Sequence, residues 1–500
     1  MTPSAAAAAA TAAHRFGLGE ADLLTVGPEA RGWLLAQLGA AEPQHGSGLV
    51  SSAQGVRLYA EFLQQQRRPQ PAQVQAASMV ETESAAPAAL PAMPAVPAAN
   101  FVPFEPLRRA VQNDTRARLV TAARSRQPFA ERLVLFWANH FTVSLAKNST
   151  RGLVGAFERE AIRPHIAGRF ETLLQAAVTH PAMLRYLDNE LSAGPDSAVV
   201  RRQSRRARAD GQPGPRITGL NENLAREVLE LHTLGVAGGG AAYGGWGGYT
   251  QADVSAFAAV LTGWRVPVRA LMDDANPASE SPPTRFEPAY HQPGPKTVLG
   301  RPYAEGPDAL AALLRSLAQH PSTARFVCTK LARHFVADDP PPALVARLEA
   351  SWQRSDGDLA EVLRTLVDAP SAWVVQAHKL KTPEEFVISS VRLLGLGERA
   401  FERNADGGIN ALGQRVHGAP SPAGWPDRAE EWLGPDAVWK RVEWATRAAD
   451  RVGRQIDARR LALASLGPLL QPDTARQIER AADGPQALAL LLLAPEFQRR

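Results

Sequence analysis

Between Gly219 and Trp264 the chain carries its densest run of polar side chains able to do chemistry. Glu227 and Glu230 stand three residues apart, and Asp253 follows a glycine-rich stretch. Carboxylates that lie close together can exchange protons with a substrate or bind a hard divalent cation such as Mg²⁺ or Ca²⁺. We therefore take these three acids as candidate catalytic residues, with acid–base or hydrolytic chemistry as the reaction type.

Two helices are expected to position the three acids. Asn221 is a favourable N-cap and Gly235 a favourable residue just beyond a helix end, so we predict a helix over 222–234. One face of this helix should be apolar and pack on a core through Leu224, Val228 and Leu231. The opposite face should carry a polar stripe made of Asn223, Arg226, Glu227 and Glu230.

The second helix should follow the glycine-rich stretch. Thr250 begins it with Asp253 in the capping-box position, and Gly263 ends it. Two helices joined by a glycine-rich loop can fold back on each other, which would bring Asp253 close to the two glutamates. A purely structural role fits the same residues, because ion pairs four residues apart and a helix cap need no ligand. Spacing alone does not separate the two roles.

His140 is the fourth candidate catalytic residue. It ends an aromatic stripe that includes Phe136 and Trp137, so its imidazole should be buried. A buried imidazole needs a hydrogen-bond partner, and we expect Glu227 or Glu230 to supply it. That carboxylate would be either a structural acceptor or the group that orients a general base.

Further polar residues in and near this stretch are candidates for ligand binding. His291 and Lys296 share the sequence HQPGPK, where they could contact an anionic ligand or only stabilise a hydrogen-bonded turn. His232 lies on the apolar side of its helix, where a core histidine is commoner than a ligand-binding one. The remaining candidates are Asn221, Asn223, Arg226, Tyr249 and Thr250.

Composition and periodicity favour a large helical protein. The 500 residues are 45% apolar, which suffices for a sizeable core, and the net charge is only +5. The single cysteine, Cys328, excludes an intrachain disulfide and a cysteine-based zinc site. Zinc-protease, Walker, dinucleotide-binding and α/β-hydrolase motifs are absent, so no nucleotide cofactor is expected. We predict an all-α fold with long loops and at most a short β-hairpin near 286–300.

Composition also divides the chain into three parts. Residues 1–65 should form N-terminal helices that pack on the main domain, and residues 101–500 should form that helical domain. Between them, 66–100 is rich in proline and alanine, which predicts a flexible linker or long loop. The arginine run at 201–208 lacks interleaved aromatics, so a solvated loop fits better than nucleic-acid binding.

No stretch is apolar over the 18 or so residues that a membrane span needs, so no span is expected. The N-terminus lacks the basic and leucine-rich regions of a signal peptide, which favours the cytoplasm, or export if the start codon is misassigned.

Several longer motifs together resemble the bacterial DUF1800 family. They include NENLAREVLELHTLG (221–235), YTQADVSAFAAVLTGW (249–264), HRFGLG, RLVLFWANHFTVS, HQPGPKTVLG, HPSTARFVCTKLARHFVADDPP, KTPEEFVISSVRLLG and PSPAGWPD. The resemblance implies an α-helical protein with few strands and brings no established activity. Its motif positions are Asn221, Glu222, Asn223, Arg226, Glu227, Glu230, His232, Tyr249, Thr250, Asp253 and Trp264, with His140, His291 and Trp425 outside the central stretch.

Two functions of different classes fit the sequence. The first is a ligand-binding or catalytic protein that works through the central Glu, Asp, Arg and His side chains, its substrate and any cofactor being unknown. The second is a non-enzymatic scaffold or accessory protein. DUF1800 members are often encoded beside DUF1501 proteins, which resemble alkaline phosphatases and sulfatases, so the resemblance implies a DUF1501-like partner. A catalytic site needs an open pocket, whereas a structural network should be closed and fully hydrogen-bonded.

Overall fold

The structure, a computed structural model, describes residues 4–67, 104–209, 219–235, 248–266, 268 and 283–500. The predicted linker at 66–100 lies outside these residues, apart from Gln66 and Arg67 at the end of a helix.

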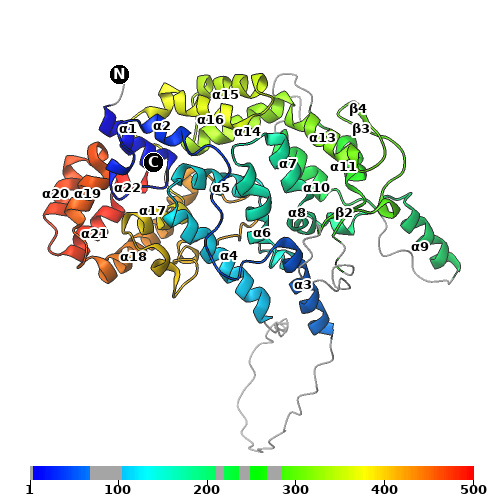
Figure 1. The fold of residues 1–500 in the computed structure, drawn as a ribbon, viewed down its shortest axis with the longest axis horizontal. Coiled ribbons are helices and arrows are strands. Elements are labelled where there is room, and N and C mark those ends of the chain that lie inside the picture. Colours follow the sequence, from blue (N-terminus) through cyan, green and yellow to red (C-terminus); the bar gives the residue numbers. More distant parts are fainter. Residues whose placement is uncertain (1–3, 68–103, 210–218, 236–247, 267, 269–282) are drawn as a thin grey trace, which may run out of the picture.

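Helices supply nearly all of the regular structure in the described residues, which confirms the all-α prediction (Figure 1). The α-helices of the first half are α1 (Ala5–Thr11), α2 (Ala30–Leu35), α3 (Ser52–Arg67), α4 (Glu105–Arg124), α5 (Pro128–His140), α6 (Val154–Phe157), α7 (Phe170–Thr179), α8 (Pro181–Tyr186), α9 (Ala198–Ala209) and α10 (Asn223–Glu227). Those of the second half are α11 (Gln251–Leu261), α13 (Asp308–Ala318), α14 (Pro321–Phe335), α15 (Pro342–Arg354), α16 (Leu359–Asp368), α17 (Pro383–Leu393), α18 (Pro435–Val452), α19 (Ala458–Leu466), α20 (Pro472–Glu479), α21 (Gly484–Leu493) and α22 (Pro495–Gln498). Within the described part of the chain, none of these helices is both long and apolar enough to cross a lipid bilayer.

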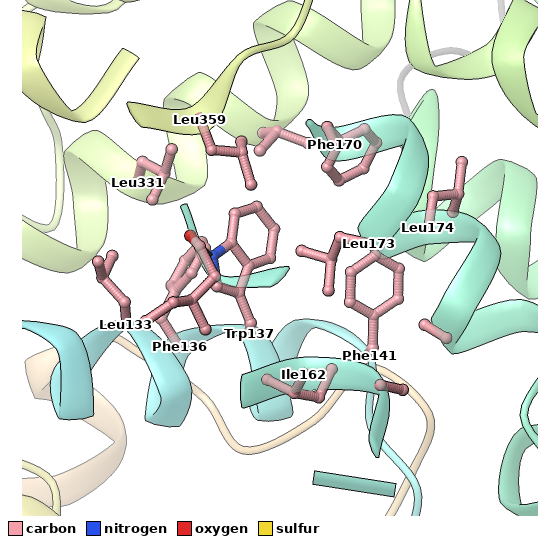
Figure 2. Packing of buried hydrophobic residues seen from close by; sticks show 14 of the residues in the cluster. Leu133, Phe136, Trp137, Phe141, Ile162, Phe170, Leu173, Leu174, Leu331 and Leu359 are labelled. Carbon is pink, nitrogen blue, oxygen red and sulfur yellow. Dashed lines mark hydrogen bonds between the residues drawn. The ribbon is translucent and has the colours of Figure 1, made fainter. Parts of the chain in front are cut away.

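The larger hydrophobic core surrounds Trp137 of α5 (Figure 2). Phe170 at the start of α7, Leu331 of α14 and Leu359 of α16 pack around it. Trp137 is 1% exposed, and its Nε1 donates a hydrogen bond to the carbonyl of Ile166 at 3.1 Å. The ring is therefore buried without leaving a polar atom unpaired, which stabilises the fold by roughly 3 kcal/mol.

A second core lies between α4, α17 and the helices α18–α21, which occupy the orange and red end of the ribbon (Figure 1). The two cores share elements. On α5, Leu133 and Trp137 belong to the first core while Leu135 belongs to the second. Near the N-terminus, Phe16 and Leu18 are both fully buried, one in each core.

The central helix differs from the prediction in its winding. α10 continues directly into a π-helix, η7 (Val228–Thr233). The predicted ends, 222 and 234, lie within one residue of the observed ones. The Asn221 side chain accepts a hydrogen bond from the Asn223 amide at 3.0 Å, and Gly235 follows the helix with a φ of 83°. The wider π-turn rotates the residues that follow Val228. As a result Leu231, which was predicted to face the core, is only half-buried, whereas His232 is fully buried.

Two small antiparallel hairpins supply the strands. β1 (Trp264–Arg265) pairs with β2 (Arg285–Phe286), and β3 (Lys296–Val298) pairs with β4 (Arg301–Tyr303). The strand signal near 286–300 is confirmed, but its two ends pair with different segments and not with each other. Leu299 and Gly300 both have positive φ, so a two-residue turn closes β3 onto the next strand.

The arginine run at 201–208 lies on a helix, α9, and the prediction of a loop there is wrong. Alanine and arginine are among the strongest helix formers, so the run continues the helix that begins at Ala198. The exposed arginines of this helix are Arg201, Arg202, Arg205, Arg206 and Arg208.

Candidate functional site

The central helix meets α11, although through residues that the sequence did not single out as catalytic. Glu222 accepts hydrogen bonds from Gln251 at 2.7 Å and from Ser255 at 2.6 Å. Arg226 donates to both Glu222 and Gln251. These contacts join two helices on a partly exposed surface, which is a structural use of the predicted polar stripe.

Asp253 is occupied as a helix cap. One carboxylate oxygen accepts hydrogen bonds from the amide and hydroxyl of Thr250, and the other accepts the Leu299 amide at 2.7 Å. Burial raises the pKa of Asp253, but these hydrogen bonds outweigh it and lower the pKa below its ordinary value. Both carboxylate oxygens of Asp253 are thus used by Thr250 and Leu299.

Glu227 and Glu230 lie half-buried near two tyrosines. Burial, followed by the charge of Glu230, raises the pKa of Glu227. Burial and the nearby Glu227 raise the pKa of Tyr186 to about 12, and burial and Glu230 raise that of Tyr249. The two glutamates therefore form a pair of repelling carboxylates.

His140 is buried as predicted, but its partner is not a carboxylate. Its Nε2 donates a hydrogen bond to the backbone carbonyl of His232 at 3.1 Å, which leaves Nδ1 as an unprotonated nitrogen without a hydrogen-bond partner. Burial, and then the positive charge of Lys330, hold the pKa of His140 well below its ordinary value. Both ring nitrogens of His232 also lack partners, and burial lowers its pKa to about 3. Both imidazoles are therefore neutral near pH 7.

His291 and Lys296 contact each other. The Lys296 ammonium donates to Nε2 of His291 at 2.8 Å and also to the carbonyl of Gln292. Nδ1 of His291 donates to the carbonyl of Thr262 at 2.7 Å. These hydrogen bonds join the turn after β2 to the end of α11, which is the structural role weighed for this pair.

A cavity of about 310 Å³ brings other chemical groups together. Its walls come from α5, α14, the start of α17 and the segment 414–431, so it lies where the two hydrophobic cores meet. Pockets at such boundaries are common binding sites. Two of the residues singled out from the sequence motifs, His140 and Trp425, line it. Its charged lining residues are Arg118, Lys330, Arg333, Arg428, Glu384, Glu385, Asp427 and Glu431.

An Asp–His pair stands in the wall of the cavity. Nδ1 of His334 lies 3.1 Å from Oδ2 of Asp427 and donates to it, while Nε2 has no hydrogen-bond partner. Burial lowers the pKa of His334, although Asp427 opposes this effect. Burial raises the pKa of Asp427, but the interaction with His334 and the charge of Lys379 outweigh burial and lower the pKa far below its ordinary range. The carboxylate is thus ionised and holds the imidazole in a fixed tautomer, as in sites with a general base.

Two cations in the same wall have no counter-ion among the described residues. The Lys330 ammonium makes no hydrogen bond or ion pair with any of these residues and lies 5.5 Å from the ring centre of Phe326. Nε of Arg333 donates to the backbone carbonyl of Asp338 at 3.1 Å, and the two terminal nitrogens of its guanidinium have no partner within the described ranges. By contrast, Arg118 is paired with Glu384 and Glu158, so its charge is neutralised.

Trp425 is fixed in the cavity wall by one amide side chain. Oδ1 of Asn139 accepts the Trp425 amide at 2.8 Å, and Nδ2 of Asn139 donates to the Trp425 carbonyl at 2.9 Å. The neighbouring His417 has a φ of 53°, a left-handed conformation that costs a non-glycine residue energy. Strained residues are found most often near functional sites.

The sequence prediction missed Lys330, Arg333, His334, Glu385 and Asp427. All five lie in motifs that carried the family resemblance, namely HPSTARFVCTKLARHFVADDPP, KTPEEFVISSVRLLG and PSPAGWPD. Within the first motif, Lys330, Arg333 and His334 are spaced at i, i+3 and i+4, which places them on one helix face. That spacing was the available signal for a site on α14.

A metal site is not assembled within the described ranges, where no group of three or more His, Cys, Asp and Glu side chains is placed to hold an ion. The central acids Glu227, Glu230 and Asp253 are thus not arranged as a ligand set.

The fold and the cavity define an all-helical protein with a charged, histidine-lined pocket between two cores. The chain belongs to the DUF1800 family of proteins of unknown function, whose family model matches residues 11–499. No curated protein and no solved structure matches the chain.

Proposed function

We propose that the protein binds a small anionic molecule in the α5–α14 cavity and carries out acid–base chemistry on it. The supporting observation is that Lys330 and Arg333 line the cavity without a counter-ion in the described part of the chain, next to the His334–Asp427 pair. Unpaired cations are costly to leave in a partly desolvated wall, and an anionic ligand would neutralise them.

Each group in the wall has a role in this proposal. Arg333 binds a carboxylate or phosphate through the two terminal nitrogens of its guanidinium. His334, oriented by Asp427, takes or gives a proton at Nε2. His140, held neutral with a free Nδ1, is a second proton acceptor at the other wall. The cavity volume suits a small metabolite more than a polymer.

Thermal unfolding with a panel of anions tests the proposal. Inorganic phosphate, phosphate monoesters and di- and tricarboxylates are each added to the wild type, to Arg333→Ala and to Arg447→Ala. Arg447 is the matched control, because it is exposed, paired only with Glu443 and outside the cavity lining. A ligand at a hundred times its Kd should stabilise the folded state by about 2.7 kcal/mol.

We expect at least one anion to stabilise the wild type and Arg447→Ala but not Arg333→Ala. If no anion stabilises the wild type, or if Arg333→Ala responds equally, the proposal fails. The accessory-protein function predicted from the sequence would then be the better one, and binding to a DUF1501-like protein would be measured next.

A further inference from the structure

The chain uses lysine sparingly. Only six of its 55 basic residues are lysine, the others being arginine. Arginine keeps its charge under all physiological conditions, whereas lysine can lose its proton and become a nucleophile. A lysine at a particular place in such a chain therefore supplies something that arginine cannot.

Most of the other lysines are held by partners. Direct partners are present for Lys147 (Asp188), Lys296 (His291), Lys379 (Asp338 and Asp427) and Lys440 (Asp436). Lys381 is fully buried over the ring of Phe497 and out of reach of a substrate. Among these six, Lys330 combines a place in the cavity lining with the absence of any hydrogen bond or ion pair to a described residue.

The surroundings of Lys330 suit an amine that must react. Phe326 lies one turn before Lys330 on α14. Phe136 and His140 of α5 line the same cavity. Burial lowers the pKa of Lys330 to about 8, with Asp427 opposing the shift and Arg333 adding to it. About a tenth of the amine is then neutral at pH 7, on the order of a hundredfold more than for an ordinary lysine.

We propose that Lys330 is a nucleophile that forms an imine with the carbonyl group of an anionic substrate, such as a 2-oxo acid or an aldehyde that carries a phosphate. The inference rests on the proposed function, since Arg333 holds the anionic group and so presents the carbonyl to Lys330. Such a substrate requires a cation that binds its anionic group, here Arg333, beside an amine that can lose its proton and attack its carbonyl, here Lys330.

The step balances without any further reactant. The neutral amine of Lys330 adds to the carbonyl carbon, the C=O π electrons move to the oxygen, and a proton passes from nitrogen to that oxygen. A second proton transfer makes the hydroxyl leave as water while the nitrogen lone pair forms the C=N bond. His334, fixed by Asp427, and His140 are the groups able to carry these protons.

Reductive trapping tests the imine. The full-length protein is incubated with pyruvate, glyoxylate or pyridoxal 5′-phosphate, and borohydride then reduces any imine to a stable secondary amine whose position is found by peptide mass spectrometry. Acetone is the uncharged carbonyl control. The variants are Lys330→Arg, which keeps the charge but cannot form the adduct, and Lys440→Arg, which replaces an exposed lysine outside the cavity.

We expect one dominant adduct on Lys330 in the wild type and in Lys440→Arg, none on residue 330 in Lys330→Arg, and little with acetone. The rate of adduct formation should rise through a midpoint near pH 8, well below the midpoint of an ordinary lysine near 10.4. Comparing the yield of adduct with pyruvate or glyoxylate against the yield with pyridoxal 5′-phosphate shows whether the site prefers a 2-oxo acid or a phosphorylated aldehyde.

The same samples are also tested for stabilisation by inorganic phosphate. If anions stabilise both the wild type and Lys330→Arg but no adduct forms on Lys330, the imine is refuted and the proposed function stands. If neither stabilisation nor adduct is seen, both are refuted. Equal labelling of Lys330 and Lys440 would also overturn the inference, since it would show an ordinary amine.

Discussion

Replacing Glu385 by glutamine would remove a buried charge on which two arginines depend. Oε1 of Glu385 accepts from Arg132 at 2.6 Å and lies 3.0 Å from Nη2 of Arg500, while Oε2 accepts from Nε of Arg500 at 3.1 Å. The side chains of both arginines are fully buried and that of Glu385 is 3% exposed. Glutamine keeps the shape but removes the charge and replaces one acceptor oxygen by a donor group.

The size of the effect follows from the electrostatics of Glu385. Burial alone would raise its pKa, but Arg500 and Arg132 outweigh burial and lower it from 4.5 to about 2. At roughly 1.4 kcal/mol for each pH unit, this fall corresponds to about 3 kcal/mol of stability. Breaking a buried ion pair by removing one partner costs about 3–5 kcal/mol in other proteins, so the two arguments agree.

Urea unfolding followed by tryptophan fluorescence measures the loss, with Glu105→Gln as the matched control. Glu105 also contacts two arginines, Arg108 and Arg109, and these partners lower its pKa to about 2, but all three side chains are exposed. Solvent screens such pairs, so the control should show no measurable change in stability.

The pH dependence gives a second check. Because the folded-state pKa of Glu385 is depressed, its stabilisation is complete above the ordinary carboxyl pKa near 4.3 and is lost as the pH falls towards 2. The difference between wild type and Glu385→Gln should therefore be constant near neutrality and shrink in that acidic range. An equal loss for Glu105→Gln, or a difference that persists at pH 2, would show that burial of the pair is not the cause.

Three further substitutions follow from the packing and from the central acids. Gly155→Ala should cost at least about 2 kcal/mol, because a Cβ at this position of α6 would collide with the buried carboxylate of Asp114. Gly32→Ala in α2, where a Cβ would meet only one side-chain carbon at 3.8 Å, should leave stability unchanged or improve it in the same urea titration. Glu227→Gln should stabilise the protein slightly at pH 7, since it removes repulsion from Glu230, and this gain should vanish below about pH 4, where Glu227 is protonated in both folded and unfolded states. A large loss of stability at pH 7 in Glu227→Gln would contradict the raised pKa.

Local structure was predictable wherever the deciding residues lie within a turn of each other. Asn221 and Gly235 set the ends of the central helix, and Thr250 with Asp253 form the expected capping box on α11. Caps depend on backbone amides two or three positions away, so the sequence alone contains the necessary information. The long, strongly periodic helices of the cores follow for the same reason.

The candidate site was less predictable because its contacts are distant in sequence. Asp427 lies 93 positions after His334, and no local pattern pairs them. The predicted hydrogen-bond partner of His140, a glutamate, is wrong. The prediction assumed a regular helix, whereas the π-turn of η7 presents the backbone carbonyl of His232 to the imidazole. The strong polar stripe at 221–230 was also misleading, since Glu222 and Arg226 use it to join two helices.

Sharing α5 between the two cores restricts how the cavity can change its width. A hinge motion that separated the cores would pull Leu133 and Leu135, neighbours on one helix, in different directions and expose both to water. Widening the cavity by moving the cores apart is therefore costly, because α5 is packed into both of them. The segment 414–431 is tied to the same helix, since the Asn139 amide holds Trp425 with two hydrogen bonds.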